Sequence, residues 1–459
     1  MYYFWSRDVK DGYYTKNPET YKKQQIQALI YRLNQPWVRT EQSAFTNVSV
    51  FDHPYFESIF GGAQFPDGTF MIDEEEEIIQ FQKDFIDVVN EIREKTIFTF
   101  PVLTASLLYQ NKKFVDEDFA KWACKASMKW NLFNFFTDSS VTSLSNCCRL
   151  KNDISNLGFF NSIGGTALKV GSVKVATINL ARLAYMSSKN ETTFLTLLKD
   201  IVLDDVKILD IIRDIIKRNV EKGLLPNFSY GLIDFKSLYN TIGINGIFEV
   251  MKSFGYTYED ELGNTYYKEE AYKLGQKLFE TIDDVIKEFT LDKDYQINKE
   301  QIPAEQAAIK FQEADKLLFP EQVITDLPLY GNQWISLGKK ATLVERVKVC
   351  AAFDKYCNGG SILHCNVDKD FSTFEQAWKM LNWIAEQGVT YFAFNGKVSR
   401  CINKHSFYGD YCPVCGEHFI DQYTRVVGFY TNTATWSKQR KEEFNLRQWM
   451  EVDDKGENA

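Results

Sequence analysis

Apolar residues recur at helical spacing along several long segments of the chain. In the segment 17–34, Ile26, Leu29, Ile30 and Leu33 share one stripe of a helix. The segment 73–93 opens with Asp73 and four glutamates, which favour a helix N-terminus electrostatically. The same spacing predicts further helices over 117–135, 191–222, 247–254, 269–289, 304–318 and 373–386.

Shorter runs of β-forming residues lie between these helices. Strands are predicted over 44–50, 97–103, 174–180, 361–367 and 390–394, with 174–180 as a buried strand. A polar loop is predicted over 137–143, and a glycine-punctuated turn over 239–246. No internal repeat and no linker rich in Pro, Gly or Ser divides residues 1–395, so we interpret this span as one mixed α/β body.

Composition narrows the class of protein. A chain of 459 residues with 44% hydrophobic residues can bury a large core. The formal net charge of −9 argues against a broad nucleic-acid-binding surface. The longest apolar stretch, 97–109, is too short to span a bilayer, and the first eight residues lack the pattern of a secretory signal. We therefore expect a cytoplasmic protein that binds neither nucleic acid nor membrane.

Three of the nine cysteines lie near the C-terminus with a histidine among them. Cys401, His405, Cys412 and Cys415 fall within fifteen residues, and glycine follows Cys415. Three thiols and one imidazole are enough for a closed tetrahedral zinc site, which predicts a structural rather than a catalytic metal. A redox-active dithiol at Cys412 and Cys415, or unrelated buried cysteines, are the alternatives.

Two other places offer candidate chemistry. Cys147 and Cys148 are adjacent in a loop between a predicted helix and a predicted strand, where a reactive thiol would lie. Two small core residues are an equally good interpretation, because free cysteine is among the most buried residue types. Gly428 lies among β-forming and aromatic residues, and a lone glycine there usually marks a bulge or a close backbone approach. Taken alone, these residues do not name a reaction.

Read together and in order, ten segments resemble the anaerobic (class III, glycyl radical) ribonucleoside-triphosphate reductases. The resemblance spans nearly the whole chain, and its specificity comes from the collinear order of the segments. They are residues 43–48, 98–104, 147–150, 175–182, 241–246, 330–335, 359–364, 412–416, 425–430 and 436–447.

The resemblance implies a ten-stranded α/β barrel followed by a small C-terminal domain. The expected parts are a catalytic portion over 1–395 with a finger loop around 140–150, a zinc-binding segment over 396–420, and a glycyl radical loop and tail over 421–459. It implies a glycyl radical on Gly428 and a thiyl radical on Cys148, which directly precedes arginine as in family members with one cysteine here. Asn179 is implied beside the substrate, and Asn332 and Ser336 near its phosphates.

The chain departs from the family in three places. Ala181 stands where the family has proline, which concerns the local turn. Lys404 stands where a fourth zinc-binding cysteine is usual, so that His405 is the expected fourth ligand. The family's ATP-cone, specificity helices and first barrel strands, with a second active-site cysteine, have no counterpart before Met1. A split enzyme, a fragment and a divergent short homologue are the competing explanations, and the split enzyme fits the complete radical machinery best.

The implied partners are a radical-SAM activating enzyme, a separate N-terminal reductase subunit, a second copy in a homodimer, and a ribonucleoside triphosphate substrate. Nucleotide effectors would act through the missing N-terminal part. Two other functions compete with the reductase: another glycyl radical reaction, such as that of an acyltransferase or a dehydratase, and a catalytically silent regulatory or scaffolding subunit. The segments around Cys148, Asn179 and the zinc ligands disfavour the first of these.

Overall fold

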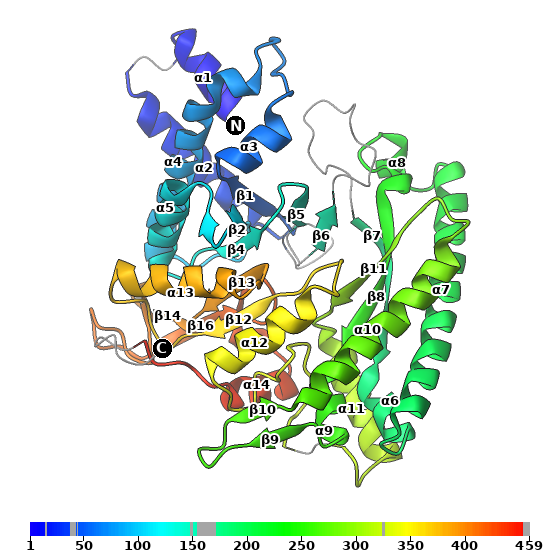
Figure 1. Ribbon diagram of the computed structural model, residues 1–459. Coiled ribbons are helices and arrows are strands. Elements are labelled where there is room, and N and C mark those ends of the chain that lie inside the picture. The colour runs from blue at the N-terminus through cyan, green and yellow to red at the C-terminus, as the bar shows by residue number, and fades with distance from the viewer. Residues whose placement is uncertain are drawn as a thin grey trace.

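The computed structural model of the chain describes residues 1–13, 16–36, 43, 45–146, 150–153, 171–323 and 326–452. In this part of the chain, two sheets face each other and helices cover their outer sides (Figure 1). The α/β prediction is therefore confirmed. Of the helices described, none is both long and apolar enough to cross a membrane.

The first sheet has the strand order β1-β2-β4-β13-β12. Its strands are β1 (Asn47–Phe51), β2 (Val102–Gln110), β4 (Asn134–Asp138), β13 (Tyr391–Asn395) and β12 (Leu363–Asn366), with the short β3 (Lys113–Phe114) on the end of β2. Neighbouring strands run parallel except for two antiparallel pairs, β4 with β13 and β2 with the short β3. Strands from both ends of the sequence therefore share one sheet.

The second sheet consists of three parallel strands. They are β11 (Ile297–Gln301), β8 (Leu238–Asn245) and β7 (Gly171–Asn179), in that order. A single parallel bridge between Glu300 and Gly360 joins β11 to the chain just before β12, so the two sheets meet along one side. Within the described residues, β1 pairs only with β2 and β7 only with β8, which leaves the outer edges of β1 and β7 open on the other side.

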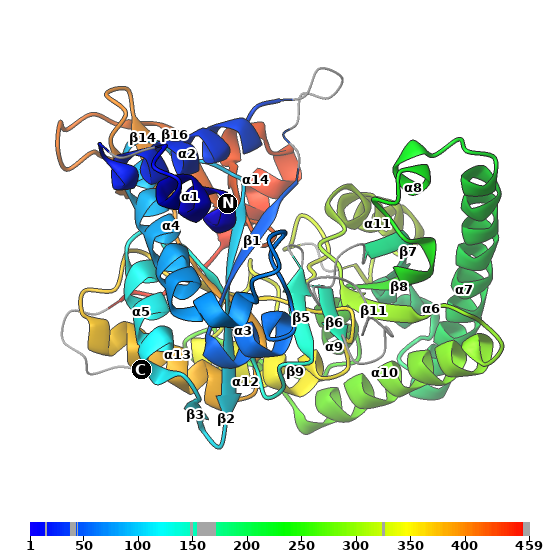
Figure 2. The same ribbon diagram turned by 90° about the horizontal axis from the view of Figure 1, so that it is seen from above.

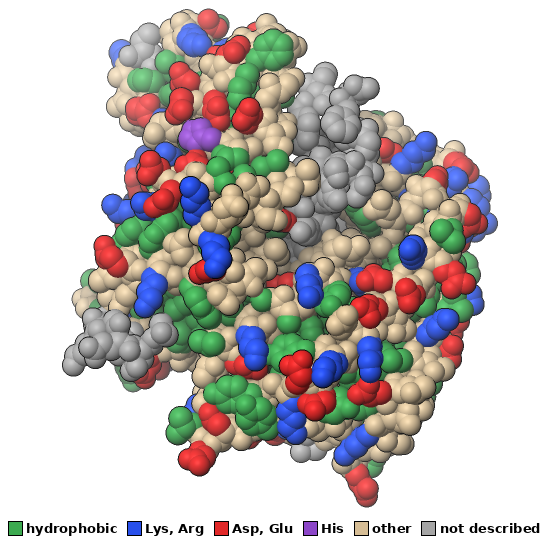
Figure 3. Space-filling model, viewed as in Figure 1, with side chains coloured by type: hydrophobic (Ala, Val, Ile, Leu, Met, Phe, Trp, Pro, Cys, Tyr) green, Lys and Arg blue, Asp and Glu red, His purple; other side chains and the backbone are tan. Residues whose placement is uncertain are grey.

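Amphipathic helices pack on the outer faces of both sheets. The first sheet is covered by α4 (Glu75–Lys95), α5 (Glu117–Met128), α12 (Leu343–Asp354) and α13 (Phe374–Glu386), and the second by α7 (Glu191–Glu221) and α10 (Glu269–Thr290). Further helices are α1 (Tyr2–Lys10), α2 (Pro18–Leu33), α3 (His53–Phe60), α6 (Leu180–Met186), α8 (Pro226–Ser229), α9 (Ile247–Ser253) and α11 (Glu305–Leu318). One continuous hydrophobic core joins most of these helices to the sheets, and among the described residues α1, α8 and α11 contribute nothing to it. On the face in Figure 3, acidic and basic side chains alternate without a field of one sign.

A hairpin lies between the two sheets. Its strands are β5 (Ser143–Asn146) and β6 (Leu150–Asp153), and Figure 2 shows it between β2 and β7. The pairing runs from Ser143 with Asp153 to Asn146 with Leu150, and β5 contacts β2 and β4. Cys147, Cys148 and Arg149, which separate the two strands in the sequence, lie outside the described residues.

A smaller antiparallel sheet follows the barrel strands. It has the order β15-β14-β16-β17, with β14 (Val398–Cys401), β15 (Ser406–Tyr408), β16 (Phe419–Arg425) and β17 (Tyr430–Asn432), and α14 (Lys438–Leu446) comes after it. The pairing of β14 with β16 contains a bulge: Arg400 opposes Asp421 and Cys401 opposes Phe419, so Ile420 has no partner on β14. Two small strands, β9 (Thr257–Glu259) and β10 (Thr265–Tyr267), form a separate hairpin.

Four sequence predictions of secondary structure were wrong in part. The predicted turn over 239–246 is mostly the buried strand β8, and only Gly246, with φ of 86°, makes the turn. The helix predicted over 117–135 ends at Met128, because Trp130 and Asn131 have positive φ and lead into β4. Strand β7 is mainly half-buried rather than buried, and β2 begins only at Val102.

Candidate active site

Gly428 lies in the loop that connects β16 to β17. Arg425 pairs with Tyr430 across the hairpin, which leaves residues 426–429 as a four-residue loop, and Gly428 in it is buried. Eleven of the described glycines have a positive φ, and Gly428 is not among them. The backbone angles at this position are therefore open to other residues, and the reason for glycine must lie elsewhere.

The carbonyl oxygen of Gly428 is held by a side chain of the first sheet. Asn134 Nδ2 donates to it over 2.7 Å and also to Tyr391 Oη over 2.9 Å. Tyr391 Oη lies 3.5 Å from Thr104 Oγ1, which donates to Asn47 Oδ1 at 3.2 Å. These side chains come from β4, β13, β2 and β1, and they lie on the sheet face opposite α4, α5 and α13. A chain of polar contacts thus crosses the sheet and ends on the glycine loop.

Arg425, which directly precedes the loop, is fully buried and holds the loop against the first sheet. Its guanidinium donates to the carbonyl oxygens of Phe394, Asn131 and Leu132, at 2.9, 2.7 and 3.2 Å. Its own backbone N–H donates to Asn395 Oδ1 at 3.0 Å. Because these partners lie on β13 and on the turn before β4, Arg425 fixes the loop to the middle of the first sheet.

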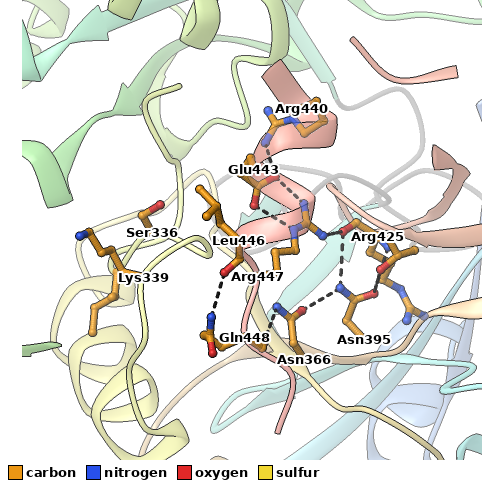
Figure 4. A network of polar contacts seen from close by, with 12 residues as sticks. Ser336, Lys339, Asn366, Asn395, Arg425, Arg440, Glu443, Leu446, Arg447 and Gln448 are labelled. Carbon is orange, nitrogen blue, oxygen red and sulfur yellow. Dashed lines mark hydrogen bonds and ion pairs between the residues drawn. The ribbon is translucent and has the colours of Figure 1, made fainter. Parts of the chain in front are cut away.

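A second buried arginine holds the same residue from the other side. Arg447 Nη1 donates to the Arg425 carbonyl oxygen at 2.9 Å, and two Arg447 nitrogens bind the Glu443 carboxylate (Figure 4). Arg440 pairs with the same carboxylate at 3.2 Å. Burial opposes ionisation of Glu443, but the charge and hydrogen bonds of Arg447 outweigh it and lower the pKa of Glu443. Glu443 is therefore a carboxylate in the folded protein.

Aromatic rings surround the rest of the loop. The Phe429 ring packs on Phe45 and Phe100, with centroids 5.1 and 5.3 Å apart. The Tyr430 ring lies between two guanidinium groups, 4.2 Å from that of Arg425 and 5.2 Å from that of Arg93. Burial lowers the pKa of Arg93 to about 10, which still leaves it cationic near neutral pH. Cation–π contacts thus add to the hydrogen bonds that hold the hairpin.

Asn179 ends β7, and its side-chain atoms have protein partners. Its Oδ1 accepts from the backbone N–H of Arg182 and caps α6, while its Nδ2 donates to Asp315 at 2.8 Å. Asp315 is fully buried and also binds Arg182 and Tyr330. The predicted substrate contact of Asn179 remains a prediction, and it would require sharing or exchange of these bonds.

Asn332 and Ser336 lie close to the end of β8. The N–H of Gly331 donates to Glu249, and its carbonyl oxygen accepts from Asn245 and Gly246. Asn332 Nδ2 is buried without a hydrogen-bond partner among the described residues, and so is Glu249 Oε2. Burial raises the pKa of Glu249 to about 7. Unpartnered buried polar atoms are uncommon, and they are typical of sites that receive a ligand or water.

Sequence reasoning missed several buried carboxylates, and Glu300 is the one on the inner face of the second sheet. Glu300 lies on β11, where Ile297 packs in the outer core and Lys299 reaches Asp283 of α10. Alternation along the strand therefore turns Glu300 toward the inner face, where it is 5% exposed. A strand that reads Ile-Asn-Lys-Glu-Gln has no apolar pattern, so only the tertiary structure shows its burial.

The four predicted metal ligands come together at the far end of the small sheet. Their ligand atoms lie within 4.8 Å of one another: Nδ1 of His405 is 3.5 Å from the sulfurs of Cys401 and Cys412, and the sulfurs of Cys401 and Cys415 are 3.7 Å apart. A tetrahedral zinc ion would require separations of about 3.6 Å for sulfur to nitrogen and about 3.8 Å for two sulfurs. The donor set therefore fits zinc with no open position.

Local turns explain how these ligands converge. Cys401 ends β14, and Lys404, with φ of 65°, turns the chain so that His405 follows. Gly416, with φ of 75°, closes the second turn through a hydrogen bond from its N–H to the Cys412 carbonyl oxygen. A hydrogen bond from the Asn403 side chain is the main cause that lowers the pKa of Cys415 to about 6, which favours the thiolate that a metal binds.

Comparison with known proteins places this architecture in one structural class. An anaerobic ribonucleotide reductase aligns with a TM-score of 0.89 and 35% identity, covering 98% of this chain and 71% of that one. The Thermotoga maritima enzyme aligns with TM-scores of 0.86 with glycerol in its active site and 0.85 in complex with dATP and CTP, at 38% and 36% identity. These two alignments cover 96% and 97% of this chain and 72% of each structure.

The chain belongs to the anaerobic ribonucleoside-triphosphate reductase family, whose model matches residues 2–449. It is therefore an oxidoreductase, and the resemblance noted in the sequence is confirmed. The search of curated protein sequences gave no match.

Proposed function

We propose that this chain reduces ribonucleoside triphosphates to 2′-deoxyribonucleoside triphosphates under anaerobic conditions, with Gly428 as the stored radical and Cys148 as the thiyl radical. The observation that carries the proposal is the glycine loop itself: a buried glycine, without a positive φ, whose carbonyl is held by Asn134 and whose base is clamped by Arg425. Glycine suits this role because a Cα radical without a side chain can be planar and delocalised over both flanking amides.

The chemistry follows from these two residues. A radical-SAM activating enzyme removes a hydrogen atom from Cα of Gly428. The glycyl radical then takes the hydrogen of the Cys148 thiol, which restores glycine and leaves a thiyl radical. The thiyl removes the 3′ hydrogen of the ribose, and the protonated 2′ hydroxyl leaves as water. Two electrons from a reductant of the formate or dithiol class, with two protons, complete the reduction at C2′. The 3′ hydrogen then returns from the thiol, and the thiyl radical that this leaves takes a hydrogen atom back from Gly428, which restores the glycyl radical.

The protein's contribution to these steps is to position the reacting groups. The β5–β6 hairpin, which carries Cys148 between its strands in the sequence, enters the space between the sheets. The polar atoms near Asn332, Ser336 and Glu249 lie close to the C-terminal ends of β7 and β8, where a nucleotide phosphate or ribose would find hydrogen-bond partners. The Thermotoga maritima enzyme has been crystallised with dATP and CTP, which supports a nucleotide as substrate and nucleotides as effectors.

We propose that zinc binds Cys401, His405, Cys412 and Cys415 and acts structurally. A closed set of four protein ligands leaves no position for substrate. Zinc would join two turns at the start of β16, seven residues before the loop that contains Gly428.

We also propose that the active enzyme is split, with a separate polypeptide that supplies the N-terminal part. Among the described strands, the outer edges of β1 and β7 are open, and this supports the split because strands added between them would continue both sheets. The chain alone, even after activation, should then show no turnover. Turnover without any partner would overturn the split.

Electron paramagnetic resonance tests the radical proposal. After anaerobic activation, a doublet should appear that is absent from Gly428→Ala, and exposure to oxygen should cut the backbone at residue 428. Cys148→Ser should keep the doublet and lose turnover in the presence of the partner, whereas Cys147→Ser, the matched control, should keep both. Absence of the doublet from activated wild-type protein would favour a silent scaffolding subunit, and turnover of a non-nucleotide substrate would favour another glycyl radical reaction.

A further inference from the structure

One buried carboxylate lies behind Asn179. Asp315, on α11, is 0% exposed. Its Oδ2 accepts from Asn179 Nδ2 at 2.8 Å and from Tyr330 Oη at 3.1 Å, and its Oδ1 accepts from Arg182 Nε at 2.6 Å. An ionised carboxylate only accepts hydrogen bonds, and each of these three partners is a donor. Asp315 therefore fixes three side chains that come from α6, from the end of β7 and from the segment before Gly331.

These contacts determine which way round the amide of Asn179 lies. Its oxygen accepts from the backbone N–H of Arg182 at 3.1 Å, while its nitrogen donates to Asp315. Turning the amide over would place its oxygen against the carboxylate and its NH2 group against the N–H of Arg182. Both contacts would then pair like with like. Asp315 and the start of α6 thus allow the Asn179 amide one orientation only.

The fixed amide still has one hydrogen to offer. An amide nitrogen carries two hydrogens, and Asp315 accepts one of them. Ile178 packs in the outer core, so alternation along β7 turns Asn179 toward the space between the two sheets. Asn179 is half-buried, whereas Asp315 is closed off from solvent. A ligand in that space would therefore meet the second N–H of Asn179, because the amide oxygen is turned to the start of α6.

The same carboxylate also reaches the segment expected to contact phosphates. Tyr330 is 1% exposed and directly precedes Gly331 and Asn332. Burial raises the pKa of Tyr330, so its hydroxyl remains a donor to Asp315. The Gly331 carbonyl oxygen accepts from Asn245, which is the register partner of Asn179 across β7 and β8. Asp315 therefore holds the candidate ribose contact and the candidate phosphate contacts in one arrangement.

We infer that Asp315 is a positioning residue for the reductase reaction: it holds the Asn179 amide so that an N–H, and not the carbonyl, is presented to a ribose hydroxyl oxygen of the substrate. The inference rests on the proposed function and adds the direction of this hydrogen bond. A fixed N–H donor stabilises negative charge that develops on a ribose oxygen during the reaction, which a carbonyl oxygen cannot do. Asp315 itself does not touch the substrate.

Exchange of the two side chains separates positioning from simple stabilisation. Asp315→Asn leaves a donor facing a donor, and Asn179→Asp leaves two carboxylates facing each other, so each single variant should unfold at a lower temperature than wild type. In the double variant, Asn179→Asp with Asp315→Asn, a donor again faces an acceptor, and the unfolding temperature should return close to that of wild type. The substrate would then meet a carboxylate oxygen, so turnover should not return with stability.

Turnover is measured with CTP on the activated chain together with the proposed N-terminal partner, and is divided by the radical doublet per chain. Both single variants and the double variant should lose about 100-fold in kcat, because each removes the positioned donor. The KM for CTP should change by less than about threefold, since the lost contact acts in the transition state. Gln312→Leu is the matched control: Gln312 is buried one turn earlier on α11, and its loss should lower stability but not kcat.

Three outcomes would overturn the inference. They are an unchanged kcat in Asp315→Asn, a double variant that regains turnover together with stability, and a double variant that regains neither. The first two would leave Asp315 a purely structural residue, and the third would show that the two side chains do not pair as described. Absence of CTP reduction by the activated wild-type chain with its partner would instead contradict the proposed function, and the inference with it.

Discussion

The two ends of β16 are held by different means. At its start, the four proposed metal ligands gather in turns that have little core around them: Cys415 is exposed, and Val414 is 72% exposed. At its end, Arg425 and Tyr430 are buried and tied by hydrogen bonds to the first sheet. With the proposed zinc bound, the start of the strand would be held by a metal, whereas its end is held by the surrounding protein. The glycine loop lies at the end that needs no cofactor to keep its place.

Removal of the metal should give the largest effect, confined to one end. Purified protein should contain about one zinc per chain, and Cys412→Ser should abolish binding and expose the amides of 401–418 to hydrogen exchange. His405→Cys, which completes a four-cysteine set, is the matched control and should retain zinc. Tyr430 should stay protected in every case, because its partners are not in the metal site. Simultaneous loss of hydrogen-exchange protection at Tyr430 would contradict the conclusion that the two ends of β16 are held by different means.

Arg425→Met should produce the next largest effect. The change leaves three buried carbonyl oxygens without their donor, and we expect a loss of about 3–5 kcal/mol in the free energy of unfolding. Arg400→Met, on the neighbouring strand, removes a partly exposed ion pair with Asp421 and should cost about 0–1 kcal/mol. Urea unfolding of both variants measures the difference, and equal losses would show that the two ends are held alike.

Asn134→Leu should have an intermediate effect. It removes the donor to the Gly428 carbonyl and to Tyr391 Oη, with an expected loss of about 1–3 kcal/mol. Because the loop backbone is then less fixed, the yield of the radical doublet per chain should fall although Gly428 is intact. Thr104→Val, which removes a more distant member of the same polar chain, should leave the doublet close to its wild-type yield.

The smallest effect concerns pH. The pKa of Glu443 is lower in the folded protein than its ordinary value of about 4.3, so its contribution to stability is present above that pH and is lost as pH falls through the folded value. Thermal unfolding between pH 6 and pH 3 should therefore show a shallower decline for Glu443→Gln than for wild type. Identical slopes would mean that Glu443 does not hold the Arg447 clamp by charge.

The sequence predicted those parts of the molecule that local pattern determines. Helices with a clear stripe, such as α10 and α13, lie close to their predicted bounds, and the four proposed zinc ligands converge as their spacing suggested. Strand β8 was not predicted because its glycines resemble a turn. In the structure, Gly243 is explained by close packing, since a Cβ there would lie 2.8 Å from Thr177 Oγ1. The contacts of Arg425 with backbone carbonyl oxygens were also not predicted, because a sequence does not show whether an arginine between strands is buried.

Describing the glycine loop required both the sequence and the structure. Gly428 was singled out through the family resemblance, whereas Asn134, which binds Gly428, and Arg447, which binds Arg425 just before the loop, carry no recognisable motif. They lie 294 and 19 positions from it in the sequence, and only the fold brings them together.

Ile420, which has no partner on β14, determines which face of the sheet each side chain of β16 lies on. Side chains along a strand alternate between faces, so deleting this one residue would make the ladder with β14 regular and turn one end of the strand over. Either Arg425 would point away from its three carbonyls, or the turn that carries Cys412 and Cys415 would face away from Cys401. A single extra residue thus lets the proposed zinc ligands and Arg425, at opposite ends of β16, both face their partners.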